Sequence, residues 1–500
     1  MDAPERLQVL VVGSATLDAT EFTRRGLILQ RAGLTDAPRL FDAARAVIVA
    51  EPPGKFALIK ECLSGLFLQA DDHELSQVII ANSLPDLAQV DALRREEHPN
   101  SNAIIIQAGE LWKAAEHIVR RRVGPPQGDV ILEPDDVPLS NDAKLLLRRA
   151  FYDCERISLE IFPDGEASIS VLRVHGWLRQ SIVGPLPLPF FVKIAGTRAI
   201  DREIRNYRLY AKHYIPFNLR PNIDDTRCVR TRSSAALVGD FVDDAVPLRQ
   251  YLRLGQGVGV LFALFETSLR GFRLQPFAKG QTPRANFLDG FVKNRIRADE
   301  LTVEVINRAR TFGLSIAPAD LQASICQAAE NISCLVGPYH GDLHSGNVMV
   351  RGSDAILIDF SSSGDGPLTA DPAALEVSLM FGTEGVDDAD SFEGWRQFAD
   401  EIYEGNVHTL HPPALSEGGA DIFSWLRRSI RELRLILLGC NAPELEAKIV
   451  LATHLMRYAR LGKYVMGNPN TAAFDRHAYA LVVAERIVKG LAPISPGRNS

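Results

Sequence analysis

The fold of this chain is decided by one polar stretch and the apolar runs beside it, Tyr339-His340-Gly341-Asp342-Leu343-His344-Ser345-Gly346-Asn347-Val348-Met349-Val350 and, after a short turn, Ala355-Ile356-Leu357-Ile358-Asp359-Phe360. Residues 348–350 and 355–358 are apolar, and a Gly-Ser-Asp turn separates them. Two short strands joined by a turn predict a β-hairpin. Such a hairpin would bring Asp342, Asn347 and Asp359 to the same end.

These three side chains would supply only oxygen atoms. Two carboxylates and one amide form a hard ligand set that suits Mg²⁺ held against substrate phosphates. The alternative is an ordinary hairpin with polar ends, which the joint spacing of the polar residues disfavours.

The pattern also resembles a known family. The order His-Gly-Asp-x-His-x-Gly-Asn followed by Ile-Asp-Phe is similar to the catalytic and metal-binding loops of the aminoglycoside and choline kinase branch of the protein-kinase-like fold. The resemblance implies that Asp342 is the catalytic base and that Asn347 and Asp359 hold Mg²⁺. His344 and Gly346 favour this small-molecule branch, because protein kinases usually carry Lys two residues after the catalytic Asp.

The charge balance disfavours a general nucleic-acid binder. The 500 residues are 23% charged with a net charge of -7, whereas nucleic-acid binders normally present a basic face. One run of arginines at helical spacing is expected to form a solvated or ion-paired helix face: Arg427, Arg428, Arg431 and Arg434.

The compartment is expected to be the cytoplasm. Six scattered cysteines without a Cys-x-x-Cys pair indicate free thiols of a reducing compartment. The N-terminus lacks the pattern of a signal peptide, and no run reaches the ~18 apolar residues needed to cross a membrane.

Residues 1–123 alternate apolar runs with helical segments. Buried parallel strands are predicted at 7–12, 46–50, 78–81 and 103–106, with helices at 18–32, 55–68, 87–97 and 109–122. This alternation predicts an α/β domain with a flavodoxin-like or receiver-like parallel sheet.

The size and order of this domain resemble a response-regulator receiver, in a degenerate form. The phospho-acceptor position is matched only by Glu51, and Gly13-Ser14-Ala15 replaces the acidic pair after the first strand. We therefore expect a module for protein contact. The alternative is an unrelated nucleotide-binding α/β domain.

Residues 124–142 are rich in Pro, Gly and Asp, which predicts a linker that few ordered contacts cross and a separately folding α/β domain. Residues 143–245 then change to hairpin patterns, with five strands and one helix after the third strand. This order is that of the small lobe of a kinase, so the fold class expected for the remainder is an α+β bilobal protein-kinase-like domain.

Two charged residues of the small lobe can be given roles from the resemblance. Lys193 lies inside an apolar strand, where an ammonium is costly unless it is paired, and Glu203 lies on the following helix. In kinases such a pair orients Lys toward the α- and β-phosphates of ATP. The alternatives are an edge-strand Lys facing solvent and a partner role for Asp201 in place of Glu203.

Two further segments would contact the nucleotide. The turn at 163–168 occupies the place of the phosphate lid, with one glycine and two acids. The segment Gly239-Asp240-Phe241-Val242 occupies the hinge, where the backbone of kinases contacts adenine, although a plain connecting strand fits the sequence equally well.

Residues 246–490 are predominantly helical and would form the large lobe, and the tail 491–500 is expected to be disordered. Asp371 and Glu376 are candidates for bracing the catalytic loop. An acidic stretch could receive a cationic acceptor, but is more often a solvated helix face: Glu393, Asp400, Glu401 and Glu404.

The function expected from the resemblance is a Mg²⁺- and ATP-dependent phosphotransferase acting on a hydroxyl-bearing acceptor, first a small molecule and second a protein. The alternative is a nucleotide-binding pseudokinase or scaffold that uses residues 1–123 for a protein partner, similar to kinase-like domains of bacterial multi-component conflict or signalling systems. Neither a nucleic-acid partner nor a membrane is expected.

Overall fold

The computed structural model describes residues 7–491 apart from 53–54, 98–100, 122–123, 135, 163–168, 182–183, 279–281, 383–391, 405–411, 415–421 and 465–470. The chain forms two compact units, one of residues 1–202 with 222–241 and the other of residues 203–221 with 242–500. Within the described residues, no helix is both long enough and apolar enough to span a bilayer.

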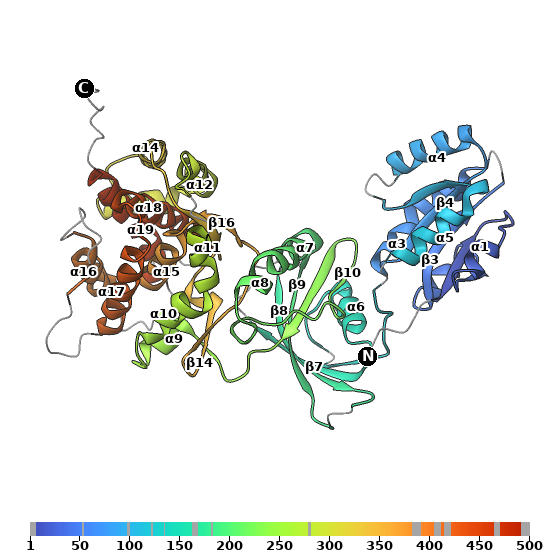
Figure 1. The fold of residues 1–500 in the computed structure, drawn as a ribbon, viewed down its shortest axis with the longest axis horizontal. Helices are drawn as coiled ribbons and strands as arrows, with labels where there is room; N and C mark the ends of the chain where they lie inside the picture. Colours follow the sequence, from blue (N-terminus) through green and yellow to red (C-terminus); the bar gives the residue numbers. More distant parts are fainter. Residues whose placement is uncertain are drawn as a thin grey trace. The chain divides into compact units, whose positions relative to one another are not determined.

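The first unit begins with a parallel five-stranded sheet (Figure 1). Its strand order is β2-β1-β3-β4-β5, which is the flavodoxin-like doubly wound order. The strands are β1 (Gln8–Val12), β2 (Ile28–Arg31), β3 (Ala44–Ala50), β4 (Ser76–Ala81) and β5 (Ile104–Gln107). The predicted α/β domain with a parallel sheet is confirmed.

Successive residues of the central strands enter two separate cores. Val47 and Val49 pack on one face of the sheet, whereas Ala46 and Ile48 pack on the other. The first face is covered by α2 (Ala57–Glu61), η2 (Cys62–Leu66), α3 (Phe67–Asp72) and α4 (Leu84–Glu97). The second is covered by α1 (Thr20–Thr23) and α5 (Leu111–Arg120). Strands buried on both faces explain the continuous apolar runs of the sequence.

The helix predicted over 18–32 is wrong. The helix α1 is only four residues long, and Gly26, with φ +74°, reverses the chain before β2. Strand β2 pairs with β1 at the edge of the sheet, and Ile28 is exposed. A half-exposed edge strand lacks the apolar run that revealed the central strands.

The second sheet of this unit has six strands in the order β10-β11-β9-β8-β7-β6. They are β6 (Ile131–Glu133), β7 (Cys154–Phe162), β8 (Ser170–Leu178), β9 (Leu188–Gly196), β10 (Val229–Arg230) and β11 (Ser234–Asp240). The helix α7 (Thr197–Asn206) follows β9 and continues as η4 (Tyr207–Ala211) and α8 (Lys212–Tyr214). The five predicted strands and the helix after the third are confirmed.

The segment 124–142 is not a loose linker. Strand β6 lies within it and pairs in parallel with β7, and Val130, Leu132 and Val137 belong to the core of the second sheet. The helix α6 (Asn141–Ala150), capped by Ser140, packs on the same core. The boundary predicted at residue 143 therefore falls inside a packed unit. The sequence did not reveal this strand, because its few apolar residues lie among prolines and do not form a longer apolar run.

Ordered contacts also join this sheet to the α/β domain. Arg149 of α6 is fully buried, and its guanidinium donates to the Asp72 carbonyl at 2.7 Å and to a Glu74 carboxylate oxygen at 2.6 Å. The backbone N–H of Arg232 donates to the Asp72 carboxylate at 2.9 Å. The expectation that few ordered contacts cross this region is thus wrong.

The second unit contains the helices α9 (Leu248–Arg253), α10 (Gly259–Ala263), α11 (Arg270–Ala278), α12 (Phe287–Arg295), α13 (Val303–Thr311), α14 (Pro318–Ala329), α15 (Ala370–Phe381), α16 (Phe392–Glu404), α17 (Ser424–Leu438), α18 (Glu444–Arg460) and α19 (Ala472–Lys489). The predominantly helical character predicted for residues 246–490 is confirmed, with α11 and α12 as unforeseen helices. The predicted tail 491–500 lies outside the described residues from 492 onward.

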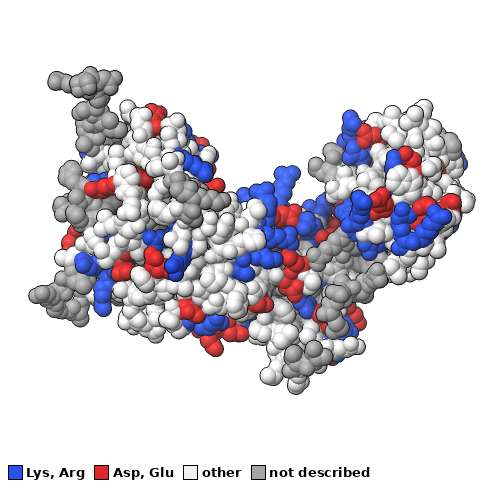
Figure 2. All heavy atoms as spheres, in the orientation of Figure 1, with Lys and Arg blue, Asp and Glu red and all other residues white. Residues whose placement is uncertain are grey.

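Exposed basic residues follow the helix that runs through α7 and α8, where Figure 2 shows Lys and Arg side chains gathered. They are Arg198, Arg202, Arg205, Arg208 and Lys212. Two of the four arginines of the run on α17 are ion-paired, which agrees with the predicted ion-paired alternative. Arg427 pairs with Glu401 at 2.5 Å, and Arg434 pairs with Glu376 at 2.9 Å.

Leu132→Ala is expected to lower the free energy of unfolding by about 2–4 kcal/mol, because Leu132 is 6% exposed in the core. Its neighbour Ile131 is 54% exposed, so Ile131→Ala should change stability by less than about 1 kcal/mol. Urea unfolding of the full chain measures both. Equal, small effects would mean that this segment is a linker after all.

Candidate active site

The predicted hairpin is present in the second unit. Strand β14 (Val348–Arg351) pairs antiparallel with β15 (Asp354–Leu357), in the register that sets Arg351 opposite Asp354 and Val348 opposite Leu357. A third strand, β12 (Val246–Pro247), pairs with β14. The Ile358 N–H donates to the Asn347 carbonyl at 3.0 Å, so the segments that carry Asn347 and Asp359 meet at the open end of the hairpin.

Asn347 also connects the hairpin to the loop before it. Its side-chain Nδ2 donates to the backbone carbonyl of Asp342 at 2.9 Å, and Asn347 itself is 6% exposed. Asp342, Asn347 and Asp359 therefore lie in segments joined by one side-chain and one backbone hydrogen bond. This confirms the hairpin that was predicted to carry them.

The loop at His340 and Gly341 is fixed by a buried carboxylate. Asp371, in the first turn of α15, accepts from the His340 N–H at 2.7 Å and from the Gly341 N–H at 3.2 Å. Burial raises the pKa of Asp371, while His340 and these two N–H groups act in the opposite direction. The bracing role considered for Asp371 fits this geometry, whereas Glu376 instead binds Arg434 of α17.

Glycine is required at position 341. Its φ is +84°, and a Cβ there would lie 2.1 Å from the Ser362 carbonyl oxygen. Strand β13 (Val336–Tyr339) enters the loop after pairing with β16 (Gly364–Pro367), which brings residue 362 against the glycine.

The segment at Asp359 has its own supports. Asp359 has a positive φ of +58°, and its Oδ1 accepts from the Ser361 N–H at 3.1 Å. Asn206 donates to the Ser361 carbonyl at 3.0 Å, and the Tyr207 ring lies 5.8 Å from that of Phe360. The last residue of α7 and the first residue of η4 thus contact the segment that follows β15.

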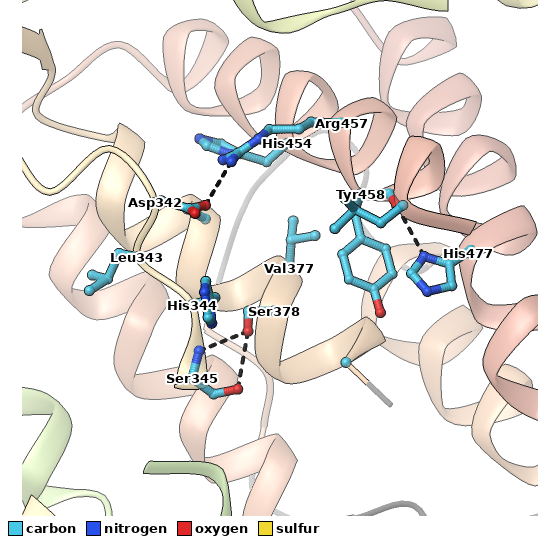
Figure 3. Close-up of a pocket in the computed structure, with 13 residues that line it drawn as sticks. Asp342, Leu343, His344, Ser345, Val377, Ser378, His454, Arg457, Tyr458 and His477 are labelled. Atoms are coloured by element: carbon cyan, nitrogen blue, oxygen red, sulfur yellow. Dashed lines mark hydrogen bonds and ion pairs between the residues drawn. The ribbon is translucent and has the colours of Figure 1, made fainter. Parts of the chain in front are cut away.

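Asp342 carries a counter-charge that the sequence did not reveal. Arg457 of α18 donates its Nη2 to Asp342 Oδ1 at 2.7 Å (Figure 3). Burial alone would raise the pKa of Asp342, but the charge of Arg457, with that of His344, outweighs it and lowers the pKa below its usual value. The carboxylate is therefore ionised at neutral pH.

Lys193 is buried in the middle of a sheet. Strand β9 lies between β8 and β11, and Lys193 is paired with Val171 and Leu237, so the edge-strand alternative is wrong. Its neighbours Val192 and Ile194 point into the core under α6, which places Lys193 on the opposite face of the sheet. It is 8% exposed.

On the following helix, Glu203 is 5% exposed. Asp201 is 42% exposed and pairs with Arg230. Glu203 is thus the buried acid of the two, and Asp201 has another partner.

The residues predicted to form the hinge lie at the end of β11 and just after it. The chain passes from the first unit to the second between Phe241 and Val242. The Asp240 N–H donates to the Asn222 carbonyl at 3.0 Å, so this donor is in use. The Phe241 ring stacks on Phe162, with 6.3 Å between centroids. A Cβ on Gly239 would lie 2.8 Å from the Asn222 carbonyl oxygen, and the lid at 163–168 lies outside the described residues.

Residues 184–401 match the model of a family described as phosphotransferase enzyme family. This part of the chain is therefore similar to that phosphotransferase family. Its loop, hairpin and helices confirm the kinase-like fold that the resemblance implied. Residues 315–488 match a second model, described as ternary complex associated domain 9.

Solved structures similar to the chain include a thermostable mutant of aminoglycoside phosphotransferase APH(4)-Ia, at 12% identity and a TM-score of 0.39, over 67% of this chain and 95% of the other. A choline/ethanolamine kinase family protein from Mesorhizobium loti is similar at 14% identity and a TM-score of 0.37, over 66% and 91%. A choline kinase from Cryptosporidium parvum Iowa II is similar at 12% identity and a TM-score of 0.35, over 67% and 88%. No curated protein matches the chain.

Gly341→Ala and Gly352→Ala form a matched pair for the phosphotransferase-family domain. Both glycines have positive φ, so either substitution should cost roughly 1–2 kcal/mol of backbone strain. A Cβ at 352 meets open space, whereas one at 341 meets the Ser362 carbonyl, which should add roughly 1–3 kcal/mol. Denaturant unfolding compares the two variants.

Hydrogen exchange gives a local reading of the same pair. In Gly341→Ala the amides of 340 and 341 should lose protection, because a displaced loop no longer reaches Asp371, while Gly352→Ala should leave them protected. Equal protection in both variants would contradict the proposed close fit at Gly341.

Proposed function

We propose that this chain transfers the γ-phosphoryl group of ATP to a hydroxyl group of a small-molecule acceptor. The observation that carries the proposal is the loop and hairpin of a phosphotransferase-family domain, with Asp342, Asn347 and Asp359 in segments tied at one end. The fixed backbone around these side chains supports a site that is organised before substrate binds.

The donor groups fit a hard divalent cation. Because Nδ2 of Asn347 donates to the Asp342 carbonyl, the Oδ1 atom of the amide is left as an oxygen donor. Together with the Asp359 carboxylate it forms an oxygen-only pair suited to Mg²⁺, which takes few protein ligands when phosphates supply the rest. Asn347 and Asp359 would thus hold the metal, which supplies charge neutralisation at the phosphates when bound.

Asp342 is the group that handles the proton. As the acceptor oxygen bonds to the γ-phosphorus and the bond to the ADP oxygen breaks, the hydroxyl proton passes to the Asp342 carboxylate. The lowered pKa of Asp342 keeps it ready to accept a hydrogen bond from the hydroxyl at neutral pH. Orienting the attacking oxygen is its main contribution.

Lys193 and Glu203 would serve the nucleotide. Lys193 lies on the face of the sheet opposite the core, where its ammonium would bind the α- and β-phosphates. Glu203, the buried acid of α7, would orient it. We place the adenine at the hinge of Gly239, Asp240, Phe241 and Val242, with the backbone beyond Asp240 as its contact because the Asp240 N–H is in use.

Asp342→Asn should lower the rate of transfer by about 10²–10⁴-fold, because the amide cannot take the proton, while nucleotide affinity stays within a few-fold. Asp359→Asn should instead lose Mg²⁺-dependent nucleotide binding. Release of ADP over a panel of hydroxylated metabolites and antibiotics measures the first, and calorimetric titration with ADP and Mg²⁺ measures the second.

Asp354→Asn is the matched control, because Asp354 lies on the same hairpin at its turn end, opposite Arg351. It should leave both quantities unchanged. Full turnover in Asp342→Asn would refute the assigned role of this carboxylate.

Lys193→Met and Glu203→Gln should each weaken binding of ADP, and their effects should not add. If the two side chains act as one unit, the coupling energy in a double-mutant cycle should be about 0.5–3 kcal/mol. Asp201→Asn combined with Lys193→Met should be additive, since Asp201 pairs with Arg230. Additivity in the first cycle would refute the pairing.

A second candidate is a nucleotide-binding scaffold that transfers nothing and contacts a protein through residues 1–123. The observation that favours it is the ion pair of Asp342 with Arg457 at 2.7 Å, since a carboxylate held by a guanidinium is a weaker proton acceptor. Binding of ATP and Mg²⁺ without ADP release on any acceptor would support the scaffold against the phosphotransferase.

A further inference from the structure

A cavity of about 260 Å³ opens beside Asp342 in the second unit (Figure 3). Its walls come from the catalytic loop and from α15, α18 and α19. This volume is below the range of roughly 300–1,000 Å³ typical of pockets for drug-sized ligands, so a compact acceptor fits it best.

The charges in the cavity give a cation no free carboxylate to bind. Among the residues that line it, Asp342 is the one carboxylate and Arg457 the one permanently charged cation, and each neutralises the other at 2.7 Å. No further acid lines the described cavity. A cationic acceptor would therefore approach a guanidinium without a carboxylate of its own to bind.

The acids that could have received a cation are engaged elsewhere. Glu393 pairs with Arg396 at 2.7 Å, Asp400 with Arg486 at 2.6 Å, and Glu401 with Arg427 at 2.5 Å. None of these three lines the cavity, and the Glu404 side chain lies outside the described part.

A second polar group at the cavity wall is the imidazole of His454. His454 lies one turn before Arg457 on α18 and is 4% exposed, and its Nε2 has no hydrogen-bond partner among the described residues. Burial, with the charges of Arg295 and Arg457, holds the pKa of His454 well below its usual value. The neutral ring can donate from Nε2 in one tautomer, and leaving a buried polar atom unsatisfied costs about 1–3 kcal/mol.

We propose that the acceptor is a short hydroxylated molecule with an anionic group, a carboxylate or a phosphate, which Arg457 and His454 bind. The inference rests on the proposed phosphotransferase function and specifies its acceptor. Arg457 exchanges Asp342 for the acceptor's anionic group, and this exchange leaves Oδ1 of Asp342 to take the hydroxyl proton.

The 2.7 Å between Arg457 Nη2 and Asp342 Oδ1 limits the length of the acceptor. One group must reach the guanidinium while the hydroxyl reaches the adjacent carboxylate. The hydroxyl and the anionic group therefore lie within a few bonds of each other, as in a small hydroxy acid or a hydroxyalkyl phosphate.

Four three-carbon alcohols of different charge test the proposal with the full-length protein, ATP and Mg²⁺. They are neutral glycerol, anionic glycerate, anionic glycerol 3-phosphate and cationic 3-amino-1,2-propanediol. At least one anion should have kcat/KM higher than glycerol by roughly 10–100-fold, the worth of a hydrogen bond to a charged group. The cation should be the poorest acceptor.

Arg457→Glu should reverse the order and favour the cation, whereas Arg457→Lys should keep the anions first. Arg460→Glu is the matched control: Arg460 lies on the same helix, is 24% exposed against 25% for Arg457, pairs with Glu300 and does not line the cavity. It should leave the order of acceptors unchanged.

Thermal stabilisation by glycerate and by glycerol 3-phosphate gives a reading without turnover. Stabilisation of the wild type that Arg457→Glu abolishes and Arg460→Glu retains supports the anion site. If the anions bind in this way and none of the alcohols is phosphorylated, the anion site holds and the proposed transfer function fails. If the cation is phosphorylated best by the wild type, transfer holds and the present inference is overturned.

Discussion

Two backbone N–H groups of one loop donate hydrogen bonds to a single buried carboxylate, and the geometry of the site depends on these two hydrogen bonds. Asp371 binds His340 and Gly341, and Asp342 is the next residue. Asp371 lies in α15. The N-cap residue of this helix, Thr369, donates its hydroxyl to Glu446 of α18 at 2.8 Å. The position of the catalytic loop is therefore set by how the helices of the second unit pack. A loop held only by its own turns would gain no such precision.

The ionisation of Asp342 depends on the same helix packing. A carboxylate in a partly enclosed site would otherwise have its pKa raised by burial, and Arg457 of α18 reverses that shift. For the proposed transfer, Arg457 would have to release or share the Asp342 carboxylate when a hydroxyl approaches. An acceptor with its own anionic group would take over the guanidinium, whereas a cationic acceptor would not.

Features that a few consecutive residues determine could be predicted from the sequence. The hairpin at 348–357 and the buried Lys193 follow from local apolar runs and one turn. Strand β6 could not be predicted, because three residues gain strand character only from pairing with β7. Arg457 lies 115 positions from Asp342, and one arginine in a helix gives no signal of a contact at that distance. The sequence thus predicted the hairpin and the buried position of Lys193, and missed the contact between Asp342 and Arg457.

The two family matches overlap but extend over different parts of the chain. The phosphotransferase match ends at residue 401, before α17 begins, whereas the match to ternary complex associated domain 9 runs from 315 to 488. The matches share residues 315–401, which include the catalytic loop, the hairpin and Asp371. Arg457 and His454 fall in the part covered by the second match alone. The loop and hairpin residues proposed for phosphoryl transfer are therefore separate in sequence from Arg457 and His454, which are proposed to bind the acceptor.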